Sequence, residues 1–175
     1  YKRQVLKTAI SDLEVDQREV NSKLYNIRYP IENSEDFITI ATTRPETMLG
    51  DTAIAVNPSD ERYKKVVGKF VTIPLVGRKI KIIEDEYADP EQGTGAVKIT
   101  PAHDFNDYEV GERNNLEIIN VFTENGKINE NAPKEFIGLD RFEARKHLLK
   151  KLKENNFFVE EENIKNKVPY GDRSN

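Results

Sequence analysis

Apolar and polar residues alternate along much of this chain, and alternation at every second position is the pattern of a β-strand. The strongest example is Phe37 to Thr42, FITIAT, which is rich in β-branched residues. The same pattern predicts further short strands at Glu19–Tyr29, Thr52–Val56, Phe70–Ile73, Arg78–Glu84, Ala96–Thr100 and Ile118–Phe122, and one that begins at Phe157. The two strands that flank Leu75-Val76-Gly77 are expected to pair as a hairpin, and Arg3 to Val15 is expected to be extended.

Helix signals occur in three segments: Glu61 to Val67, followed by Gly68; Asp104 to about Asn114; and Asp140 to Asn155. An aspartate begins each of the last two, where its carboxylate can cap free backbone N–H groups. The longest helix carries Phe142, Leu149 and Leu152 on one stripe. Pro45 interrupts the strand pattern, so Arg44 to Gly50 is expected to be a loop. Many short strands without regular βαβ alternation predict an α+β fold, a β-barrel-like domain with peripheral helices.

The composition is that of a globular protein and limits the available chemistry. The 175 residues fit a single domain, residues 1–175, and the chain is polar but not disordered, with 37% hydrophobic residues. It has no cysteine, which excludes disulfides and thiolate ligands and fits a reducing, cytoplasmic location. With only His103 and His147 as histidines, no metal site is expected.

The net charge of −4 argues against broad binding to a phosphate backbone. A short single-stranded RNA end needs only a few donors and a stacking surface, so it stays a candidate partner. Basic residues gather late in the longest helix, where a solvated face is expected: Arg145, Lys146, Lys150, Lys151 and Lys153. No apolar run approaches the roughly 20 residues of a membrane span, so no membrane contact is expected.

The stretch from Gly93 to Tyr108, GTGAVKITPAHDFNDY, concentrates the candidate chemistry. It opens with a Gly-Thr-Gly turn, which lets backbone N–H groups approach a ligand closely. The strand that follows carries Lys98 and Thr100, and the next helix begins with Asp104 and Asp107 one turn apart. These groups suit a small ligand that has an ammonium group and hydroxyl groups. The alternative is a simple corner, with aspartates that only cap the helix and a lysine that faces solvent.

A second polar cluster lies earlier in the chain. The blocks TTRPETMLGDTAIAVNP, from Thr42, and GTGAVKITPAHDFNDYEVG, from Gly93, together resemble the two signature blocks of the editing domain of valyl-tRNA synthetase. This domain is the connective-polypeptide insert of the large class I synthetases for valine, isoleucine and leucine. TAISDLEV (Thr8 to Val15) and GDRSN (Gly171 to Asn175) resemble the segments where the insert leaves and rejoins the synthetase body. The resemblance covers essentially the whole chain and implies a single β-barrel-like editing domain excised from a larger enzyme.

The resemblance implies hydrolysis of the ester that joins a wrong amino acid, here threonine, to the terminal adenosine of tRNA(Val). Threonine and valine are near isosteres, and valyl-tRNA synthetases are known to separate them only about a hundredfold in the synthetic pocket, so a second site must favour the hydroxyl. The implied partners are the threonine-bearing acceptor end and the rest of the synthetase; threonyl-adenylate is a further candidate substrate. No cofactor is expected in this domain, because ATP belongs to the parent's synthetic site, whose HIGH and KMSKS signatures are absent here.

The resemblance also implies roles for individual residues. Asp107 corresponds to the aspartate that anchors the α-ammonium group, a bond that contributes roughly 1.5–3 kcal/mol. Asp104 shares this work or only caps the helix, and Lys98 is the candidate for reading the threonine hydroxyl. The catalytic candidates are Asp107, Thr42, Thr43 (a pair that lines the pocket and helps to place water) and Lys98. The substrate-binding candidates are Arg44, Glu46, Gly93, Thr94, Gly95, Thr100, His103 and Asp104, with the glycine turn as an oxyanion hole and His103 as a less favoured general base.

Two other functions stay open. The first is an editing domain of the isoleucyl type that clears valine, although HDFND and Lys98 favour the valine type. The second is a non-catalytic module that only docks the tRNA acceptor end, which the acidic net charge disfavours. Hydrolysis of threonyl-tRNA and of valyl-tRNA distinguishes all three.

Overall fold

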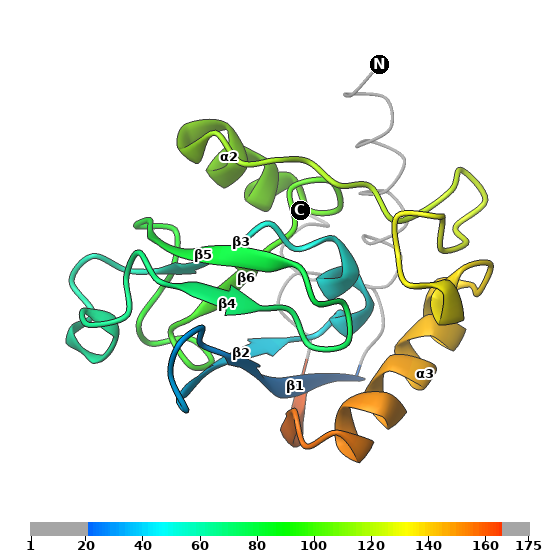
Figure 1. Ribbon diagram of the computed structural model, residues 1–175, viewed down its shortest axis with the longest axis horizontal. Helices are drawn as coiled ribbons and strands as arrows, with labels where there is room; N and C mark the ends of the chain where they lie inside the picture. Colours follow the sequence, from blue (N-terminus) through cyan, green and yellow to red (C-terminus); the bar gives the residue numbers. More distant parts are fainter. Residues whose placement is uncertain (1–20, 166–175) are drawn as a thin grey trace.

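The computed structural model describes residues 21–165, and within them seven strands form two sheets (Figure 1). The first sheet has the order β2-β1-β7 and is antiparallel: β1 Asn21–Pro30, β2 Phe37–Thr42 and β7 Phe158–Lys165. The second has the order β4-β5-β3-β6, with β3 and β5 parallel: β3 Ala53–Val56, β4 Phe70–Thr72, β5 Lys79–Glu84 and β6 Val97–Ile99. The helices α2 (Phe105–Asn114) and α3 (Arg141–Glu154) lie on different sides of these sheets.

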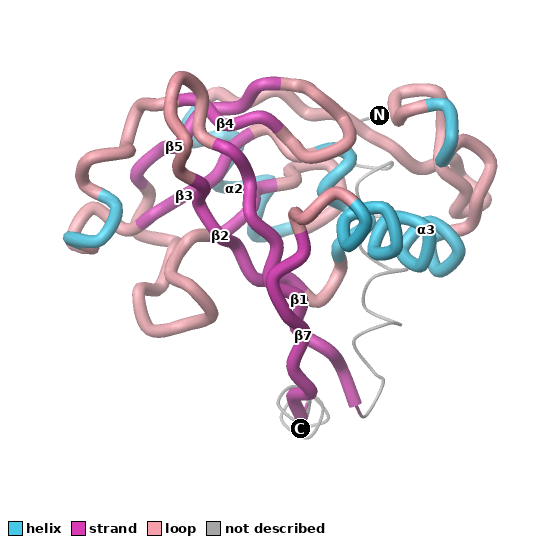
Figure 2. Tube along the Cα trace, turned by 60° about the horizontal axis from the view of Figure 1, so that its bottom comes forward, coloured by secondary structure: helices cyan, strands magenta, loops and turns pink. Residues whose placement is uncertain are grey.

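The predicted α+β class is confirmed, and the barrel-like arrangement does not close. The two sheets meet at one corner, where Ile31 bridges Val71 and the Glu32 N–H donates to the Phe70 carbonyl at 2.8 Å. Figure 2 shows β1 and β7 running away from this corner as a long twisted ribbon. Within residues 21–165, the strands therefore form two joined sheets with free outer edges.

Three short segments differ from the sequence predictions. The expected helix at 61–67 is only a 3₁₀ turn, η2 (Glu61–Tyr63), and the expected loop at 44–50 contains a 3₁₀ helix, η1 (Pro45–Gly50). A further 3₁₀ turn, η3, spans Lys134–Phe136. The expected strand at 118–122 has a single bridge, Phe122 to Ile128, because the His103 ring accepts the Val121 N–H that a ladder would need. The segment predicted to be extended at 3–15 lies outside the described residues.

Strand β3 is buried on both faces, and this explains its continuous apolar sequence, AIAV. Ile54 and Val56 contribute to the large core, which also includes residues of the first sheet and α3. Ala53 and Ala55 form a second cluster with Val110 of α2. The small alanines let α2 pack close to the sheet. No helix among residues 21–165 is long and apolar enough to span a membrane.

The predicted cap of α3 is confirmed, and of its predicted stripe Leu152 is buried and Leu149 packs against the core, whereas Phe142 does not. Asp140 forms a capping box with Glu143. The buried residues are Ala144, Leu148 and Leu152, whereas Phe142 is 48% exposed. The expectation of a wholly solvated basic face is also wrong at Arg145, whose Nε and Nη2 donate to Glu46 at 2.7 and 2.9 Å. This ion pair joins α3 to η1. The carboxylate of Glu46 is fully buried, so it depends on Arg145 for its positive partner.

The substitution Arg145→Met should lower the free energy of unfolding by roughly 2 to 4 kcal/mol, since it leaves a buried carboxylate without its cation. Chemical denaturation of the two proteins measures this loss. Lys150→Met, an exposed change on the same helix, should stay within about 0.5 kcal/mol of wild type. Adding Glu46→Gln to Arg145→Met should restore part of the loss; equal stability of all four proteins would contradict the assignment.

Candidate functional site

A cavity of about 560 Å³ opens where the two motif blocks meet. Its walls come from β1 and β7, the end of β2, η1 and the residues before it, the loop between β5 and β6, strand β6 and the beginning of α2. The lining residues are Leu24, Ala41, Thr42, Thr43, Arg44, Thr47, Tyr87, Asp89, Gln92, Gly93, Thr94, Ala96, Val97, Lys98, Asp104, Asp107 and Ile164. The fold thus brings together eight of the residues predicted from the sequence: Thr42, Thr43, Arg44, Gly93, Thr94, Lys98, Asp104 and Asp107.

Two carboxylates mark one side of the cavity. Asp104 caps α2 by accepting the Asp107 N–H at 3.0 Å, and its other oxygen accepts Arg44 Nη2 at 2.7 Å. Asp107 is 6% exposed and accepts the Thr100 N–H at 2.9 Å. The Arg44–Asp104 ion pair joins the first motif block to the second, and the solvated first-turn alternative for Asp107 does not hold.

Burial raises the pKa of Asp107 to about 7, and the neighbouring Asp104 adds to this rise while Lys98 opposes it. Burial raises the pKa of the Tyr87 phenol, and the nearby carboxylates of Asp107 and Asp104 add to this rise. A ligand cation in the cavity would favour the ionised form of Asp107. The site therefore suits an ammonium group chemically.

Lys98 lies at the floor of the cavity and belongs to a buried polar network. It is 6% exposed, so the alternative of a lysine facing solvent does not hold. Its ammonium contacts Asp51 Oδ1 at 2.8 Å and Thr47 Oγ1 at 2.8 Å, and it also donates to the Thr100 hydroxyl. Asp51 is completely buried and accepts the hydroxyls of Tyr29 and Thr100, both at 2.7 Å.

The hydroxyl groups of this network have fixed directions. Thr47 accepts from Lys98 and donates to the Arg44 carbonyl at 2.9 Å. Burial raises the pKa of Asp51, whereas Lys98, Thr100 and Tyr29 oppose that rise. Thr47 and Lys98 are the members of the network that reach the cavity.

The glycine turn is built for packing as much as for a ligand. Gly93 and Thr94 line the cavity, but the Gly95 N–H donates to the Gln92 carbonyl at 2.9 Å. Gly95 has φ +86°, and a Cβ there would lie 2.5 Å from Arg62 Nη2. The predicted oxyanion hole therefore lacks the N–H of Gly95.

Four predicted residues do not line the cavity: Glu46, Gly95, Thr100 and His103. Glu46 pairs with Arg145, and Thr100 lies behind Lys98. His103 is 1% exposed, and its Nε2 accepts the Val121 N–H at 3.0 Å. Burial lowers the pKa of His103 to about 3, with Lys98 and Arg44 adding to the effect. It is a neutral histidine that holds a loop, and this geometry does not suit a general base.

Sequence reasoning missed Thr47, Asp51 and Tyr87. Thr47 and Asp51 belong to the first motif block, and a lone aspartate two residues before the apolar run AIAV is the signal that could have marked a buried charge. Tyr87 lies in an acidic loop without periodicity. Within residues 21–165, no group of three or more His, Cys, Asp or Glu side chains is placed to hold a metal ion.

Comparison with known proteins agrees with this geometry. Residues 61–141 match the family model described as the leucyl-tRNA synthetase editing domain. Over 171 residues, the chain is 84% identical to a valine–tRNA ligase of Pelagibacter ubique (strain HTCC1062), a match that covers 98% of this chain and 20% of that protein. The fold is similar to LeuRS in the ternary complex of Agrobacterium radiobacter K84 agnB2 LeuRS, tRNA and LeuAMS, with TM-score 0.64, 20% identity and coverage of 94% and 24% of the two chains. It is also similar to GlLeuRS-CP1, with TM-score 0.62, 14% identity and coverage of 78% and 98%.

The chain belongs to the editing domains of the class I aminoacyl-tRNA synthetases. Within that class it is of the valyl-tRNA synthetase type, because nearly its whole length matches valine–tRNA ligases, at 50% identity in Caulobacter vibrioides (96% of this chain, 21% of that protein) and at 84% in Pelagibacter ubique. The resemblance carried by the two motif blocks is thereby confirmed. The chain spans about a fifth of the length of these relatives, 20% and 21%.

The raised pKa of Asp107 predicts a specific dependence of stability on pH. An unfolded aspartate loses its proton near pH 4, whereas Asp107 in the fold keeps it to about pH 7. Its contribution to stability is therefore full below about pH 4 and is lost as the pH rises through 7. Asp107→Asn should remove this loss, so the variant should gain on wild type by more than about 1.4 kcal/mol between pH 4.5 and 8. Denaturation curves at both pH values, with exposed Asp36→Asn as control, check this; parallel profiles would contradict it.

Proposed function

We propose that this cavity hydrolyses the ester bond of threonyl-tRNA(Val), and threonyl-adenylate as a further substrate. The observation that carries the proposal is the meeting of a carboxylate pair and a Lys98–Thr47 floor in one cavity of about 560 Å³. These groups match the ammonium and the hydroxyl of threonine. The family assignment supports editing in general, and the geometry supports this particular amino acid.

The α-ammonium group of threonine would bind between Asp107 and Asp104. One oxygen of Asp107 accepts the Thr100 N–H, and Asp107 lines the cavity, so a cation there can bond to its carboxylate. Asp104 is already paired with Arg44, and this leaves it mainly to shape the site. We therefore assign the main ammonium contact to Asp107.

The threonine hydroxyl would meet Thr47 and Lys98. All three ammonium donors of Lys98 are engaged within the protein, so a substrate hydroxyl must replace or share the bond to Thr47. Valine offers no oxygen there and gains no hydrogen bond from these groups, whereas the threonine hydroxyl gains one, a difference of roughly 0.5–1.5 kcal/mol. This difference favours threonine over valine.

In the reaction, a water oxygen would bond to the ester carbonyl carbon, and the bond from that carbon to the ribose oxygen would break. The water proton ends on the ribose oxygen, and the products are threonine and free tRNA. Thr42 and Thr43 stand at the cavity wall where water must approach, and the ribose hydroxyl of the substrate supplies the base. The proposal uses no metal ion, so a chelator should leave hydrolysis unchanged.

The rest of the function follows from the same proposal. The acceptor end of tRNA(Val) would contact the loop at Arg44 and the wall at Gly93 and Thr94. The remaining parts of the synthetase would deliver it and would use ATP for charging in the cytoplasm.

Asp107→Ala should remove most hydrolysis of threonyl-tRNA while the protein stays folded. The chain should be placed in the corresponding segment of a valine–tRNA ligase, and deacylation should be measured beside a thermal melt. An expected loss of tenfold or more corresponds to roughly 1.4 kcal/mol or more of binding to the ammonium group. Turnover near that of wild type, or hydrolysis of valyl-tRNA in preference to threonyl-tRNA, would overturn the proposal. Binding of tRNA without any turnover in wild type would favour a docking module.

The variants Lys98→Met and Thr47→Val should both narrow the preference for threonyl- over valyl-tRNA, by about fivefold or more, which corresponds to roughly 1 kcal/mol. Thr47→Val is the cleaner test, because it keeps the shape of the side chain and the Lys98–Asp51 pair. The measurement is the ratio of kcat/KM for the two substrates, and exposed Lys150→Met is the control. If both ratios equal the wild-type value, selectivity does not come from this floor.

A further inference from the structure

One wall of the cavity is the loop between β5 and β6, residues 85–96. Five of its residues line the cavity before Ala96: Tyr87, Asp89, Gln92, Gly93 and Thr94. The loop has internal turns, and side chains from outside the cavity also hold it. These side chains come from residues 57–63, a segment that includes η2 and has no contact with the cavity.

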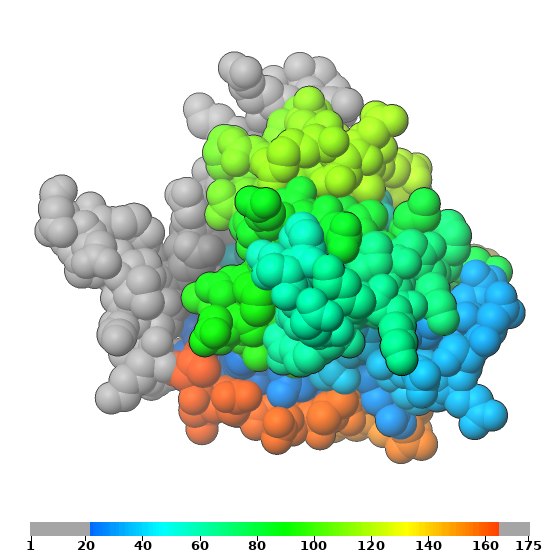
Figure 3. Space-filling model, turned by 90° about the vertical axis from the view of Figure 1, so that its left-hand side faces the viewer, coloured from blue at the N-terminus to red at the C-terminus, as the bar shows by residue number. Residues whose placement is uncertain are grey.

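Three side chains of this segment donate to backbone carbonyls of the loop. Asn57 Nδ2 donates to Ala88 at 2.8 Å, Arg62 Nη2 to Pro90 at 2.9 Å and the Tyr63 hydroxyl to Thr94 at 2.5 Å. The bonds are spread along the loop, so they fix its path rather than one point. Figure 3 shows the teal segment around η2 packed directly against the green loop at the surface.

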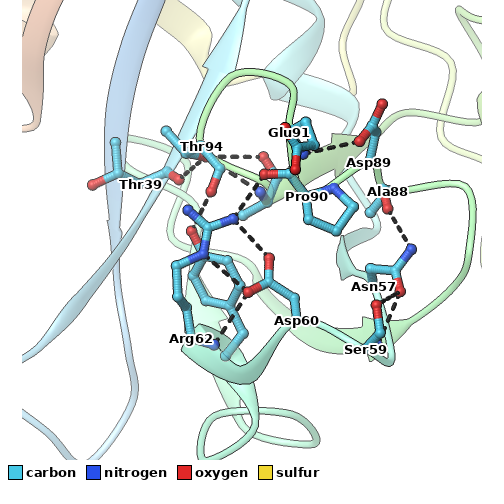
Figure 4. Close-up of polar contacts among 12 residues, drawn as sticks. Thr39, Asn57, Ser59, Asp60, Arg62, Ala88, Asp89, Pro90, Glu91 and Thr94 are labelled. Atoms are coloured by element: carbon cyan, nitrogen blue, oxygen red, sulfur yellow. Dashed lines mark hydrogen bonds and ion pairs between the residues drawn. The ribbon is translucent and has the colours of Figure 1, made fainter.

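Arg62 is itself held in place by Asp60. Its Nε and Nη2 donate to the two oxygens of Asp60 at 2.9 and 2.8 Å, and the same carboxylate accepts the Arg62 N–H at 3.1 Å (Figure 4). The hydrogen bond from Arg62 lowers the pKa of Asp60. A fork fixed by a buried carboxylate keeps less freedom than a free arginine, so its third bond, to Pro90, is well oriented.

The glycine turn is fitted to this fork. A Cβ on Gly95 would lie 2.5 Å from Arg62 Nη2 and 2.9 Å from Asp60 Oδ2. On the other side, the Thr94 hydroxyl donates to the Thr39 carbonyl of β2 at 2.6 Å. Thr94 is thus bonded both to η2 and to β2, and its position in the cavity wall depends on both contacts.

We infer that Arg62 and Tyr63 are positioning residues for the substrate: from outside the cavity they set the wall formed by Gly93 and Thr94 against the acceptor end of the tRNA. This inference rests on the proposed function for its substrate. The carboxylates at the start of α2 are held by Thr100 and Arg44 instead. Displacement of the wall therefore weakens binding more than it slows the chemical step.

The test uses Tyr63→Phe and Arg62→Met, in the chain placed in a valine–tRNA ligase. Each removes one hydrogen bond to the loop, which should raise KM for threonyl-tRNA roughly threefold to tenfold, with kcat within about twofold. Arg62→Lys, which cannot bridge Asp60 and Pro90 together, should resemble Arg62→Met. Tyr108→Phe and Lys65→Met are matched controls outside these contacts and should leave both constants unchanged. An unchanged KM, or a fall in kcat alone, would overturn the inference.

Amide hydrogen exchange separates this inference from the proposed function, because it needs no substrate. Peptides covering residues 85–96 should exchange faster in Tyr63→Phe and Arg62→Met than in wild type or the controls, while peptides of α2 stay unchanged. Unchanged exchange in the loop would overturn the positioning role of Arg62 and Tyr63 even if the enzyme edits. Faster exchange in a protein without deacylase activity would support the positioning role of Arg62 and Tyr63 and would reject the proposed hydrolysis.

Discussion

The buried pair of Lys98 and Asp51 is the interaction on which the site depends. An ammonium group and a carboxylate, each almost free of solvent, are 2.8 Å apart between the two motif blocks. Either charge alone would be strongly destabilising there, so the pair is stable only because Tyr29, Thr47 and Thr100 complete its hydrogen bonds. This requirement fixes η1, β6 and the floor of the cavity relative to one another.

The other charges of the site are arranged around that pair. The positive charge of Lys98 opposes the rise in the pKa of Asp107, and it also helps to keep His103 neutral. Arg44 neutralises Asp104, and within residues 21–165 no ion pair matches the buried carboxylate of Asp107. A cationic ligand would supply the matching positive charge. The aspartates that attract this ligand also hold the start of α2.

Local sequence patterns predicted what local physics decides. The strand at 37–42 and the caps at Asp104 and Asp140 follow from alternation and from capping chemistry, and the structure has all three. The two motif blocks also identified most of the cavity lining. The fate of Arg145 could not be predicted, because its partner Glu46 lies 99 positions away and meets it only after the fold forms. The same is true of Asp51 and Tyr87, whose roles depend on burial and on neighbours distant in sequence.

The pairing of β1 with β7 determines where the two ends of the described chain lie. Asn21 lies opposite Lys165 in antiparallel register, so both ends of the described chain leave the body side by side along one ribbon. A unit connected in this way can interrupt a host sequence at a single surface loop without separating the host segments. Because Leu24 of β1 and Ile164 of β7 also line the cavity, bending this ribbon would move one side of the cavity wall relative to the carboxylates.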